Sequence, residues 1–249
     1  MLKIHRVTKV FGGVVALDSV SFDVRMGDIV SLVGPNGAGK TTLFNVIAGI
    51  YSCDGGQIIF DDQDVTTLPA HKKALLGLGR TFQNVRLFPS LNVLENVMIG
   101  TYCRTQSSIL DAIINSDRRK KNKIRDQAEE LLNWVGGFEL RWRLPAELSY
   151  GDQRRVEIAR SLATSPKLLI LDEPTAGMSA SEAQEIIHLM HKLTAKGLTL
   201  LLIEHNMKVV MSVSDMIVVI DFGHKIAEGS PEQIIKDPRV IQAYLGTVD

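Results

Sequence analysis

Cysteine is scarce in this sequence of 249 residues, which contains only Cys53 and Cys103. Two cysteines cannot form the disulfide framework of a small secreted domain, and they do not have the spacing of a metal knuckle. The sequence therefore predicts two reduced thiols in a cytosolic protein.

Long apolar stretches are also missing. The run from Leu198 to Ile203 spans six residues, whereas a membrane-spanning helix needs about 20. The N-terminal residues MLKIHRVTKV lack the basic and then apolar layout of a signal peptide. We therefore expect a chain that is soluble by itself and that reaches a membrane only through a partner.

An excess of one charge sign is absent as well. The 28 Lys and Arg residues balance the 28 Asp and Glu residues, so no global basic field exists to hold the phosphates of nucleic acid. What is present is the composition of a globular protein, with 45% hydrophobic and 22% charged residues. We expect one large domain or two small ones, and no nucleic-acid partner.

Short apolar runs alternate with helical periodicity in the first and last thirds of the chain. Such runs, when helices separate them, predict parallel strands joined by crossovers. Strands are expected at residues 2–10, 20–24, 29–33, 57–60, 168–171, 198–203 and 216–220, and helices at residues 40–48, 153–163, 181–195 and 206–213.

The middle third, from about residue 84 to residue 148, has mostly helical periodicity. Ala128, Leu131, Leu132 and Val135 recur at the spacing of one helix face. The basic run DRRKKNKIRD at residues 117–126 is interpreted as a solvated helix face or loop in preference to an interaction patch. These patterns predict an α/β nucleotide-binding core that a helical insertion interrupts.

Residues 34–41, GPNGAGKT, match the pattern G-x-x-x-x-G-K-[ST] between a predicted buried strand and a predicted helix. Glycines let backbone N–H groups turn toward phosphate oxygens, and the helix points its positive end at the same anion. Lys40 is expected to reach the β- and γ-phosphates, and the Thr41 hydroxyl is expected to bind Mg²⁺. The residues predicted to bind ATP in this loop are Gly34, Pro35, Asn36, Gly37, Ala38, Gly39, Lys40, Thr41 and Thr42.

Asp172 and Glu173 follow the apolar run at residues 168–171. They are therefore expected at the carboxyl end of a strand, where α/β sheets bind ligands. Asp172 is predicted to hold Mg²⁺ through water beside Thr41, and Glu173 is predicted to polarise the attacking water. Phosphoryl transfer needs mainly positioning and charge compensation, which the metal, Lys40 and an oriented water would supply.

Residues 148–153, LSYGDQ, open a predicted helix, with Ser149 and Asp152 in a capping arrangement. Here the sequence resembles the ATP-binding-cassette (ABC) ATPases, whose signature reads LSGGQ. The resemblance implies that Ser149 and Gly151 bind the γ-phosphate held by the phosphate loop of a second cassette. Hydrolysis would then require two cassettes arranged head to tail, and a helix N-terminus would supply N–H donors to the polyanion.

The same resemblance carries three further expectations. Phe11 stands where the family places an aromatic side chain that stacks on adenine. Gln83 resembles the glutamine that contacts Mg²⁺ or water and senses the membrane partner. His205, which follows the strand expected at residues 198–203, resembles the histidine that reaches the γ-phosphate. Together with Glu173, Gln83 and His205 form the predicted catalytic group.

Three positions depart from the family pattern. Tyr150 and Asp152 replace the expected Gly and Gln of the signature. Ser179 replaces the Asp that usually ends the D-loop, which here spans residues 174–179. Since Ser149 and Gly151 remain, capture of the γ-phosphate across the dimer is expected, whereas Ser179 bears on the coupling between the two sites.

The resemblance covers essentially the whole chain and implies an α/β fold. This fold is a P-loop NTPase cassette that has a mixed sheet core, an antiparallel β subdomain and an inserted α-helical subdomain. Residues 1–83 and 151–249 are expected to form the nucleotide-binding core with its β subdomain, and residues 84–150 the helical insertion. Phe88 and residues 91–97 are interpreted either as a socket for a helix of a membrane subunit or as part of the core.

Several shorter segments resemble the ATP-binding subunits of branched-chain amino acid importers. They are RTFQNVRLF at residues 80–88, LNVLENVMIG at 91–100, EHNM at 204–207, IAEG at 226–229 and YLG at 244–246. The resemblance implies an ATPase that uses ATP and Mg²⁺ to energise the import of branched-chain or other hydrophobic amino acids. Cassettes for urea or amide uptake or for lipopolysaccharide export, and a soluble ABC ATPase outside transport, remain as alternatives.

The resemblance also implies partners and a location. The expected partners are integral membrane permease subunits, a second ABC ATPase subunit in a homo- or heterodimer and, indirectly, a solute-binding protein. The expected location is cytoplasmic, peripheral on the inner face of the plasma membrane.

Overall fold

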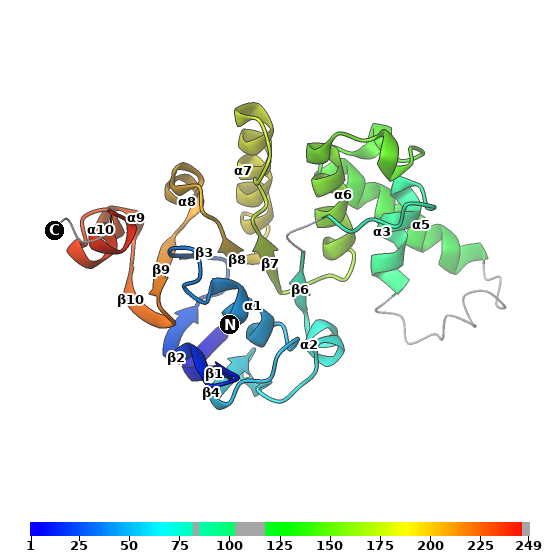
Figure 1. Ribbon diagram of the computed structural model, residues 1–249. Coiled ribbons are helices and arrows are strands. Elements are labelled where there is room, and N and C mark those ends of the chain that lie inside the picture. The colour runs from blue at the N-terminus through cyan, green and yellow to red at the C-terminus, as the bar shows by residue number, and fades with distance from the viewer. Residues whose placement is uncertain (82–84, 103–117, 246–249) are drawn as a thin grey trace.

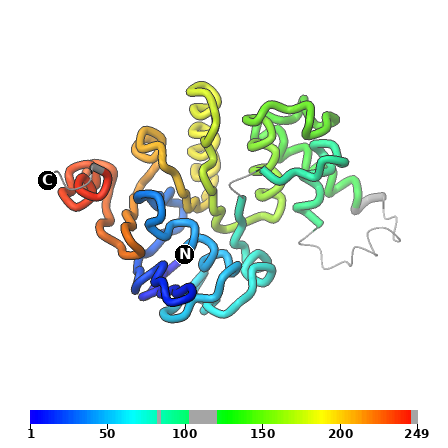
Figure 2. Tube along the Cα trace, viewed as in Figure 1, coloured from blue at the N-terminus to red at the C-terminus, as the bar shows by residue number. Residues whose placement is uncertain are grey.

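A computed structural model of the chain describes the backbone of residues 1–81, 85–102 and 118–245. Two β-sheets form the centre of the described chain, and a group of helices stands to one side of them (Figure 1). The N-terminus lies at the smaller sheet, whereas the last described residues lie at the edge farthest from that group of helices (Figure 2).

The larger sheet, six-stranded within the described residues, forms the centre of the nucleotide-binding core. Its strand order is β10-β9-β3-β8-β7-β6, with β10 antiparallel to β9 and the other neighbours parallel. Every residue of β3, β7 and β8 is buried, as expected for parallel strands covered on both faces. The strands are β3 (Ile29–Val33), β6 (Leu78–Arg80), β7 (Leu168–Asp172), β8 (Thr199–Ile203), β9 (Met216–Asp221) and β10 (His224–Gly229).

The smaller sheet is antiparallel, with the order β2-β1-β4-β5 among the described strands. It contains β1 (Leu2–Phe11), β2 (Val14–Val24), β4 (Gly55–Phe60) and β5 (Gln63–Asp64). The prediction for the second strand began at residue 20, six residues too late. Bulges at three points of the β1–β2 pairing break the alternation of apolar and polar residues that marks a regular strand.

Helices cover the larger sheet and form the group beside it. They are α1 (Lys40–Ile47), α2 (Ala70–Leu76), α3 (Val93–Tyr102), α5 (Arg118–Trp134), α6 (Tyr150–Leu162), α7 (Ala180–Thr194), α8 (Met207–Val213), α9 (Pro231–Ile234) and α10 (Pro238–Leu245), with short 3₁₀ turns at Phe138–Leu140 and Pro145–Glu147. Helix α5 includes Ala128, Leu131 and Leu132 of the predicted helix face, ends one residue before Val135, and begins earlier, within the basic run. The described side chains of that run at Lys121, Lys123 and Arg125 are exposed, as predicted for a solvated face.

Two main apolar cores lie on opposite faces of the larger sheet. Val30 and Leu32 of β3 pack with α1 and with the smaller sheet, whereas Ile29 packs with α6 and α7. The same second core contains buried residues of α3 and α5, so α6 packs both against the sheet and against these helices. The boundary that we propose from the sequence, between residues 150 and 151, therefore falls at the start of a helix shared by both parts.

The predicted architecture is confirmed: an α/β chain with a mixed sheet, an antiparallel sheet and added helices. Within residues 1–81, 85–102 and 118–245, every helix falls short of the length or the apolar character that a bilayer crossing requires.

Candidate active site

The phosphate loop, residues 34–41, leaves β3 at the carboxyl edge of the larger sheet and enters α1. Gly34 and Gly39 adopt positive φ angles of 154° and 101°. A Cβ atom on Gly34 would lie 1.9 Å from the carbonyl oxygen of Ile220, and one on Gly39 would lie 2.6 Å from that of Ala16. Glycine is therefore required at both positions, because neighbouring backbone occupies the space of a side chain.

A turn from the C-terminal part of the chain supports the phosphate loop from outside. The N–H of Gly223, between β9 and β10, donates to the carbonyl oxygen of Ala38 over 3.0 Å. The carbonyl of Gly223 accepts from the N–H of Asp18 in β2 over 2.9 Å. One residue thus joins the phosphate loop to the smaller sheet.

The start of α1 can receive an anion. Its N-cap residue, Gly39, provides no side-chain cap, and its first turn carries no acidic residue. The N–H groups of that turn and the positive end of the helix dipole therefore face the loop. The Nζ atom of Lys40 donates to the carbonyl oxygens of Gly34 and Pro35, each over 2.7 Å. Burial lowers the pKa of Lys40, and the negative charge of Glu173 opposes that shift.

Three adjacent parallel strands bring the predicted site residues to one edge. β3, β8 and β7 are neighbours in the sheet. β3 leads into the phosphate loop, β8 into Glu204 and His205, and β7 ends at Asp172 with Glu173 next. The carboxyl ends of parallel strands meet at one edge of a sheet, which is where such folds bind ligands.

Asp172 is buried and forms an ion pair that the sequence did not reveal. Its Oδ2 atom lies 3.2 Å from Nη2 of Arg80, whose Nη1 donates to Oδ1 of Asn45 over 2.7 Å. Burial raises the pKa of Asp172, and the guanidinium of Arg80 opposes that shift. Asn45 lies one helical turn after Thr41, so Arg80 connects the carboxylate to the helix that carries Thr41.

The residues around the phosphate loop fit a magnesium ion that arrives with a nucleotide. Nowhere in the described ranges do three or more His, Cys, Asp or Glu side chains form a potential metal cluster. Mg²⁺ needs no such cluster, because it is commonly held by one or two protein oxygens together with phosphate oxygens and water. The exposed hydroxyl of Thr41 and the carboxylate of Asp172 are ligands of the required kind. Gln83, predicted as a metal ligand and as a catalytic residue, lies outside the described residues.

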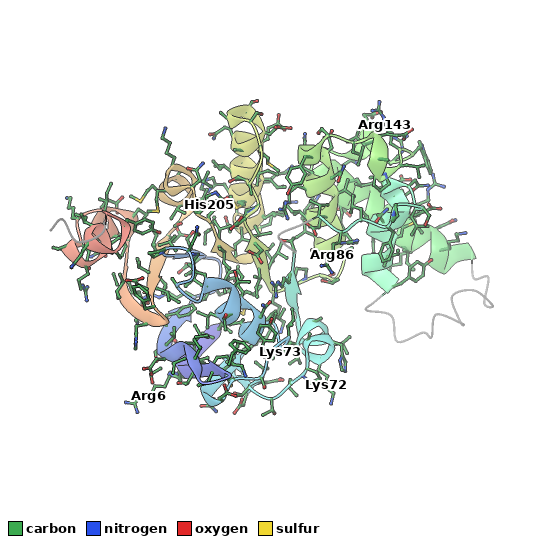
Figure 3. All side chains as sticks on the ribbon, in the orientation of Figure 1. Arg6, Lys72, Lys73, Arg86, Arg143 and His205 are labelled. Carbon is green, nitrogen blue, oxygen red and sulfur yellow. The ribbon has the colours of Figure 1, made fainter. Side chains whose placement is uncertain are left out.

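Glu173 and His205 lie next to each other at the open edge of the sheet. The Oε1 atom of Glu173 is 3.7 Å from Nδ1 of His205, whose side chain is 60% exposed. Figure 3 labels His205, which comes shortly before α8. Glu173 has a left-handed backbone, with φ of 47°, which costs a non-glycine residue about 1–2 kcal/mol. Its N–H donates to the carbonyl oxygen of Ile203 over 2.9 Å, so β8 helps to hold this conformation.

Glu204 fixes the two loops that carry these residues. Its fully buried carboxylate accepts from the N–H groups of His205 at 2.9 Å and Asn206 at 3.1 Å. It also accepts from the N–H of Thr175 at 3.2 Å and from the Thr175 hydroxyl. The sequence placed Glu204 before the histidine but did not indicate this role, since nothing in the pattern brings Thr175 to the end of β8.

Phe11 ends β1 and keeps part of its ring exposed. Its ring meets that of Tyr51 edge-on at a centroid distance of 5.4 Å, and the Nζ atom of Lys9 lies 5.1 Å from its centroid. An accessible aromatic face can stack on a purine base. Tyr51 and Lys9 were not among the predicted site residues.

Ser149 and Gly151 lie at the start of α6, and the predicted capping arrangement is confirmed. The Oγ atom of Ser149 accepts from the N–H of Asp152 over 3.1 Å and donates to its carboxylate over 2.8 Å. Gly151 is buried against Glu182 of α7. The start of α6 lies apart from α1 in Figure 1, so a single chain does not bring these residues to its own phosphate loop.

Ser179, the departure in the D-loop, caps α7. Its N–H donates to Oε2 of Glu182 over 2.9 Å, and its Oγ atom accepts from the N–H of Glu182 over 3.3 Å. Serine is among the preferred N-cap residues, so the substitution at this position is compatible with a well-formed helix start.

A glycine loop between a buried strand and an uncapped helix, with carboxylates at the end of a nearby parallel strand, defines a P-loop nucleotide-binding protein. Comparisons with known proteins narrow this class. A profile described as "ABC transporter" matches residues 17–176, and one described as "Branched-chain amino acid ATP-binding cassette transporter" matches residues 224–249. The chain belongs to the ABC transporter family, as one of its ATP-binding cassettes that hydrolyse ATP.

Relatives resemble the chain over nearly its full length. It is 42% identical to the high-affinity branched-chain amino acid transport ATP-binding protein LivG of Escherichia coli K12, covering 99% of this chain and 98% of that protein. It is 43% identical to BraF of Pseudomonas aeruginosa, described in the same words, with the same coverage.

Solved structures show the same fold. The ADP conformation of MJ1267, an ATP-binding cassette of an ABC transporter, is 35% identical and superimposes with a TM-score of 0.88 over 99% of this chain and 98% of that one. A dimeric post-hydrolysis state of the cassette MJ0796, bound to ADP and Pi, is 27% identical, with a TM-score of 0.79 over 93% of this chain and 99% of that one. The predicted family and the predicted ATP binding are thus confirmed.

Proposed function

We propose that this chain is the ATP-hydrolysing subunit of a membrane importer for branched-chain or other hydrophobic amino acids. ATP hydrolysis is supported by the position of three features at one edge of the sheet: the phosphate loop, His205 and the Asp172–Glu173 pair. The names of the relatives and the profile at residues 224–249 support the substrate class.

ATP would bind with its phosphates in the loop of residues 34–42 and its adenine against Phe11. Lys40, which now donates to two loop carbonyls, would transfer these hydrogen bonds to the β- and γ-phosphate oxygens. Glu173 would accept a hydrogen bond from the attacking water and so orient it toward the γ-phosphate. His205, close to Glu173 and exposed, would contact the γ-phosphate itself. Positioning and charge compensation of this kind are what phosphoryl transfer requires.

Thr41 and Asp172 would hold Mg²⁺, with Gln83 as a further ligand. When bound, Mg²⁺ neutralises charge on the phosphate oxygens. Arg80 keeps a positive charge beside Asp172 and ties it to α1 through Asn45, so the carboxylate is held in place before the metal arrives.

A second cassette would complete each site. Ser149 and Gly151 begin α6, whose N-terminus is available to a polyanion from another molecule. The second cassette, identical or different, would offer its signature residues to the phosphate loop of this chain in return. The dimeric MJ0796 structure supports such pairing within the family.

Permease subunits would bind in a groove between the core and the helical region. This groove has a volume of about 440 Å³, and its lining includes Ile50, Leu78, Phe88, Ile99 and Arg160. Phe88 is 46% exposed, with the guanidinium of Arg160 5.7 Å from its ring centroid. Of the predicted socket at residues 91–97, Val93, Leu94 and Val97 are buried in the second core and serve packing.

An apolar helix end of a permease fits the groove around Phe88. The chain would then be peripheral on the cytoplasmic face of the membrane, and a solute-binding protein on the other side would be an indirect partner.

The test is purification of the tagged chain from its native membranes in mild detergent, followed by mass spectrometry. We expect two multi-span proteins and a second cassette, and the associated solute-binding protein should bind leucine, isoleucine or valine in preference to urea. Phe88→Glu should abolish recovery of the multi-span proteins. Ile241→Glu, at an apolar side chain of nearly equal exposure (45%) outside the groove, is the matched control. Ribosomal or nucleic-acid partners without membrane proteins would refute the transport half of the proposal.

A further inference from the structure

A buried arginine connects the start of α6 with the turn after β7. The side chain of Arg154 is fully buried, and its Nη1 atom lies 2.8 Å from Oε2 of Glu157, which is also fully buried. Its Nη2 atom donates to the carbonyl oxygen of Glu173 over 3.3 Å and to the hydroxyl of Tyr150 over 3.4 Å. One guanidinium therefore contacts α6 and the main chain of the residue that we assign to orient the attacking water.

The guanidinium of Arg154 is held in a fixed position. A buried ion pair gives up the hydration of two charges, so it persists only with good geometry and additional hydrogen bonds. A guanidinium presents its donors in a rigid planar fork. Glu157 holds the Nη1 atom of Arg154 in place. A displacement of Tyr150, which accepts from Nη2, therefore changes the hydrogen bond that Nη2 donates to Glu173.

Glu173 depends on such support. Its left-handed φ of 47° is a conformation that persists only when the surroundings impose it. The N–H of Glu173 is held by Ile203 and its carbonyl oxygen by Arg154, so the backbone is fixed on both sides of the Cα atom. With this backbone conformation, the Glu173 carboxylate lies 3.7 Å from Nδ1 of His205.

Tyr150 connects the arginine to the signature. It stands directly between Ser149 and Gly151, and its ring centroid lies 5.9 Å from Cζ of Arg154. The ring also borders the D-loop, because a Cβ atom on Gly177 would be 3.9 Å from Cε1 of Tyr150. The glycine usual at this position in the signature could make none of these side-chain contacts.

We propose that Tyr150 and Arg154 are positioning residues that couple the two nucleotide sites of the cassette dimer. The inference rests on the proposed function, in which Ser149 and Gly151 act on the nucleotide of the second cassette while Glu173 acts on that of its own chain. Docking of the second cassette's γ-phosphate against Ser149 shifts Tyr150. Arg154 transmits the shift to the backbone of Glu173, so that each site is primed by occupancy of the other.

The contacts that lead from the signature through Tyr150 and Arg154 to Glu173 all lie within one chain. The coupling therefore operates whether or not the second cassette is identical to this one. It also gives the sites a connection that does not use the acidic residue missing from the D-loop at position 179.

The test measures the ATP dependence of hydrolysis in the complex of the full-length chain with its second cassette and permease subunits. Tyr150→Phe removes only the hydroxyl. Arg154→Met combined with Glu157→Leu removes the whole ion pair and leaves no buried charge without its partner. Arg125→Met is the matched control, because it breaks an Arg–Glu pair on a helix, with Glu129 of α5, that contacts neither the signature nor Glu173.

We expect a Hill coefficient of about 2 in the wild-type complex, the limit for two sites, and a fall toward about 1 in both test variants. The double variant should also lose about 10- to 100-fold in kcat, as a misplaced catalytic group does. Binding of a fluorescent ATP analogue to the isolated chain should not change, since the phosphate loop is untouched. Arg125→Met should keep the wild-type Hill coefficient.

Two results would overturn the coupling. One is a wild-type Hill coefficient in both folded test variants, and the other is a wild-type complex that hydrolyses ATP without cooperativity. A wild-type chain that neither hydrolyses ATP nor pairs with another cassette would instead overturn the proposed function, and the coupling with it.

Discussion

Replacing Glu204 by glutamine should loosen the edge of the sheet where the catalytic loops meet. Glutamine has nearly the shape of glutamate, but it presents one acceptor oxygen and one NH₂ group where the carboxylate presents two oxygens. Those two oxygens accept four hydrogen bonds from Thr175, His205 and Asn206. The amide oxygen can serve the backbone N–H groups of the last two residues. The NH₂ group then faces Thr175, whose hydroxyl can turn to accept but whose N–H cannot.

The expected loss follows from that count. A buried donor left without an acceptor costs about 1–3 kcal/mol, and hydrogen bonds to an amide are weaker than those to a carboxylate. We therefore expect the free energy of unfolding to fall by about 2 kcal/mol. For a chain of this size, that corresponds to a melting temperature lower by about 4–8 °C. Hydrolysis should fall with it, because Glu204 holds the segments that carry Glu173 and His205, whereas affinity for ATP should be preserved.

Thermal unfolding followed by circular dichroism, together with binding of a fluorescent ATP analogue, measures both effects. Glu95→Gln is the control, since the exposed carboxylate of Glu95 accepts from the N–H of Asn92 at a helix start and can keep that bond as an amide. A melting temperature and a turnover rate for Glu204→Gln equal to those of the control would refute the reasoning.

Three further predictions concern the loop, the catalytic carboxylate and a buried lysine. Lys40→Ala should abolish binding of the ATP analogue without lowering the melting temperature; retained hydrolysis would contradict the role of the loop. Glu173→Gln should accumulate an ATP-bound dimer on size-exclusion chromatography; a monomer with normal turnover would argue against its role. Lys73, whose Nζ atom donates to the carbonyl oxygens of Val46 and Ile47, has its pKa lowered from 10.5 to about 8 by burial, which the charges of Cys53 and Asp64 oppose. Between these pH values the unfolded chain keeps a proton that the folded chain has lost, so the contribution of Lys73 to stability rises with pH, by about 3 kcal/mol across the window. Denaturant unfolding of Lys73→Met from pH 7.5 to 10 should lack that rise relative to wild type; parallel curves would contradict the assignment.

The strands of the larger sheet could be predicted because burial on both faces makes them short, continuous apolar runs. β3 at Ile29–Val33 has the predicted bounds, and β7 and β9 extend one residue beyond them. The hairpin of β1 and β2 was harder to predict, since bulges disturb its alternation. Helix α2 was missed because its seven residues, AHKKALL, are too few to establish a period.

The residues of the candidate site also include some that the sequence could predict and some that it could not. Lys40, Asp172 and His205 belong to local motifs whose neighbours in sequence predict their place at a strand end. Arg80 and Arg154 could not be predicted, because charged residues are normally exposed and only tertiary packing brings each beside a buried carboxylate.

The hydrogen bond from Gly223 to Ala38 has a consequence for the order in which the protein matures on the ribosome. The phosphate loop is synthesised within the first 41 residues, yet the groups that fix it come from the last fifth of the chain. β3 pairs only with β8 and β9 among the described strands, so it cannot join the sheet until residues beyond 198 have been synthesised. A nascent chain therefore carries its nucleotide motif long before it can bind a nucleotide. The ability to bind ATP reports that synthesis is nearly finished, and a chain truncated before the β9–β10 turn would be left without this nucleotide site.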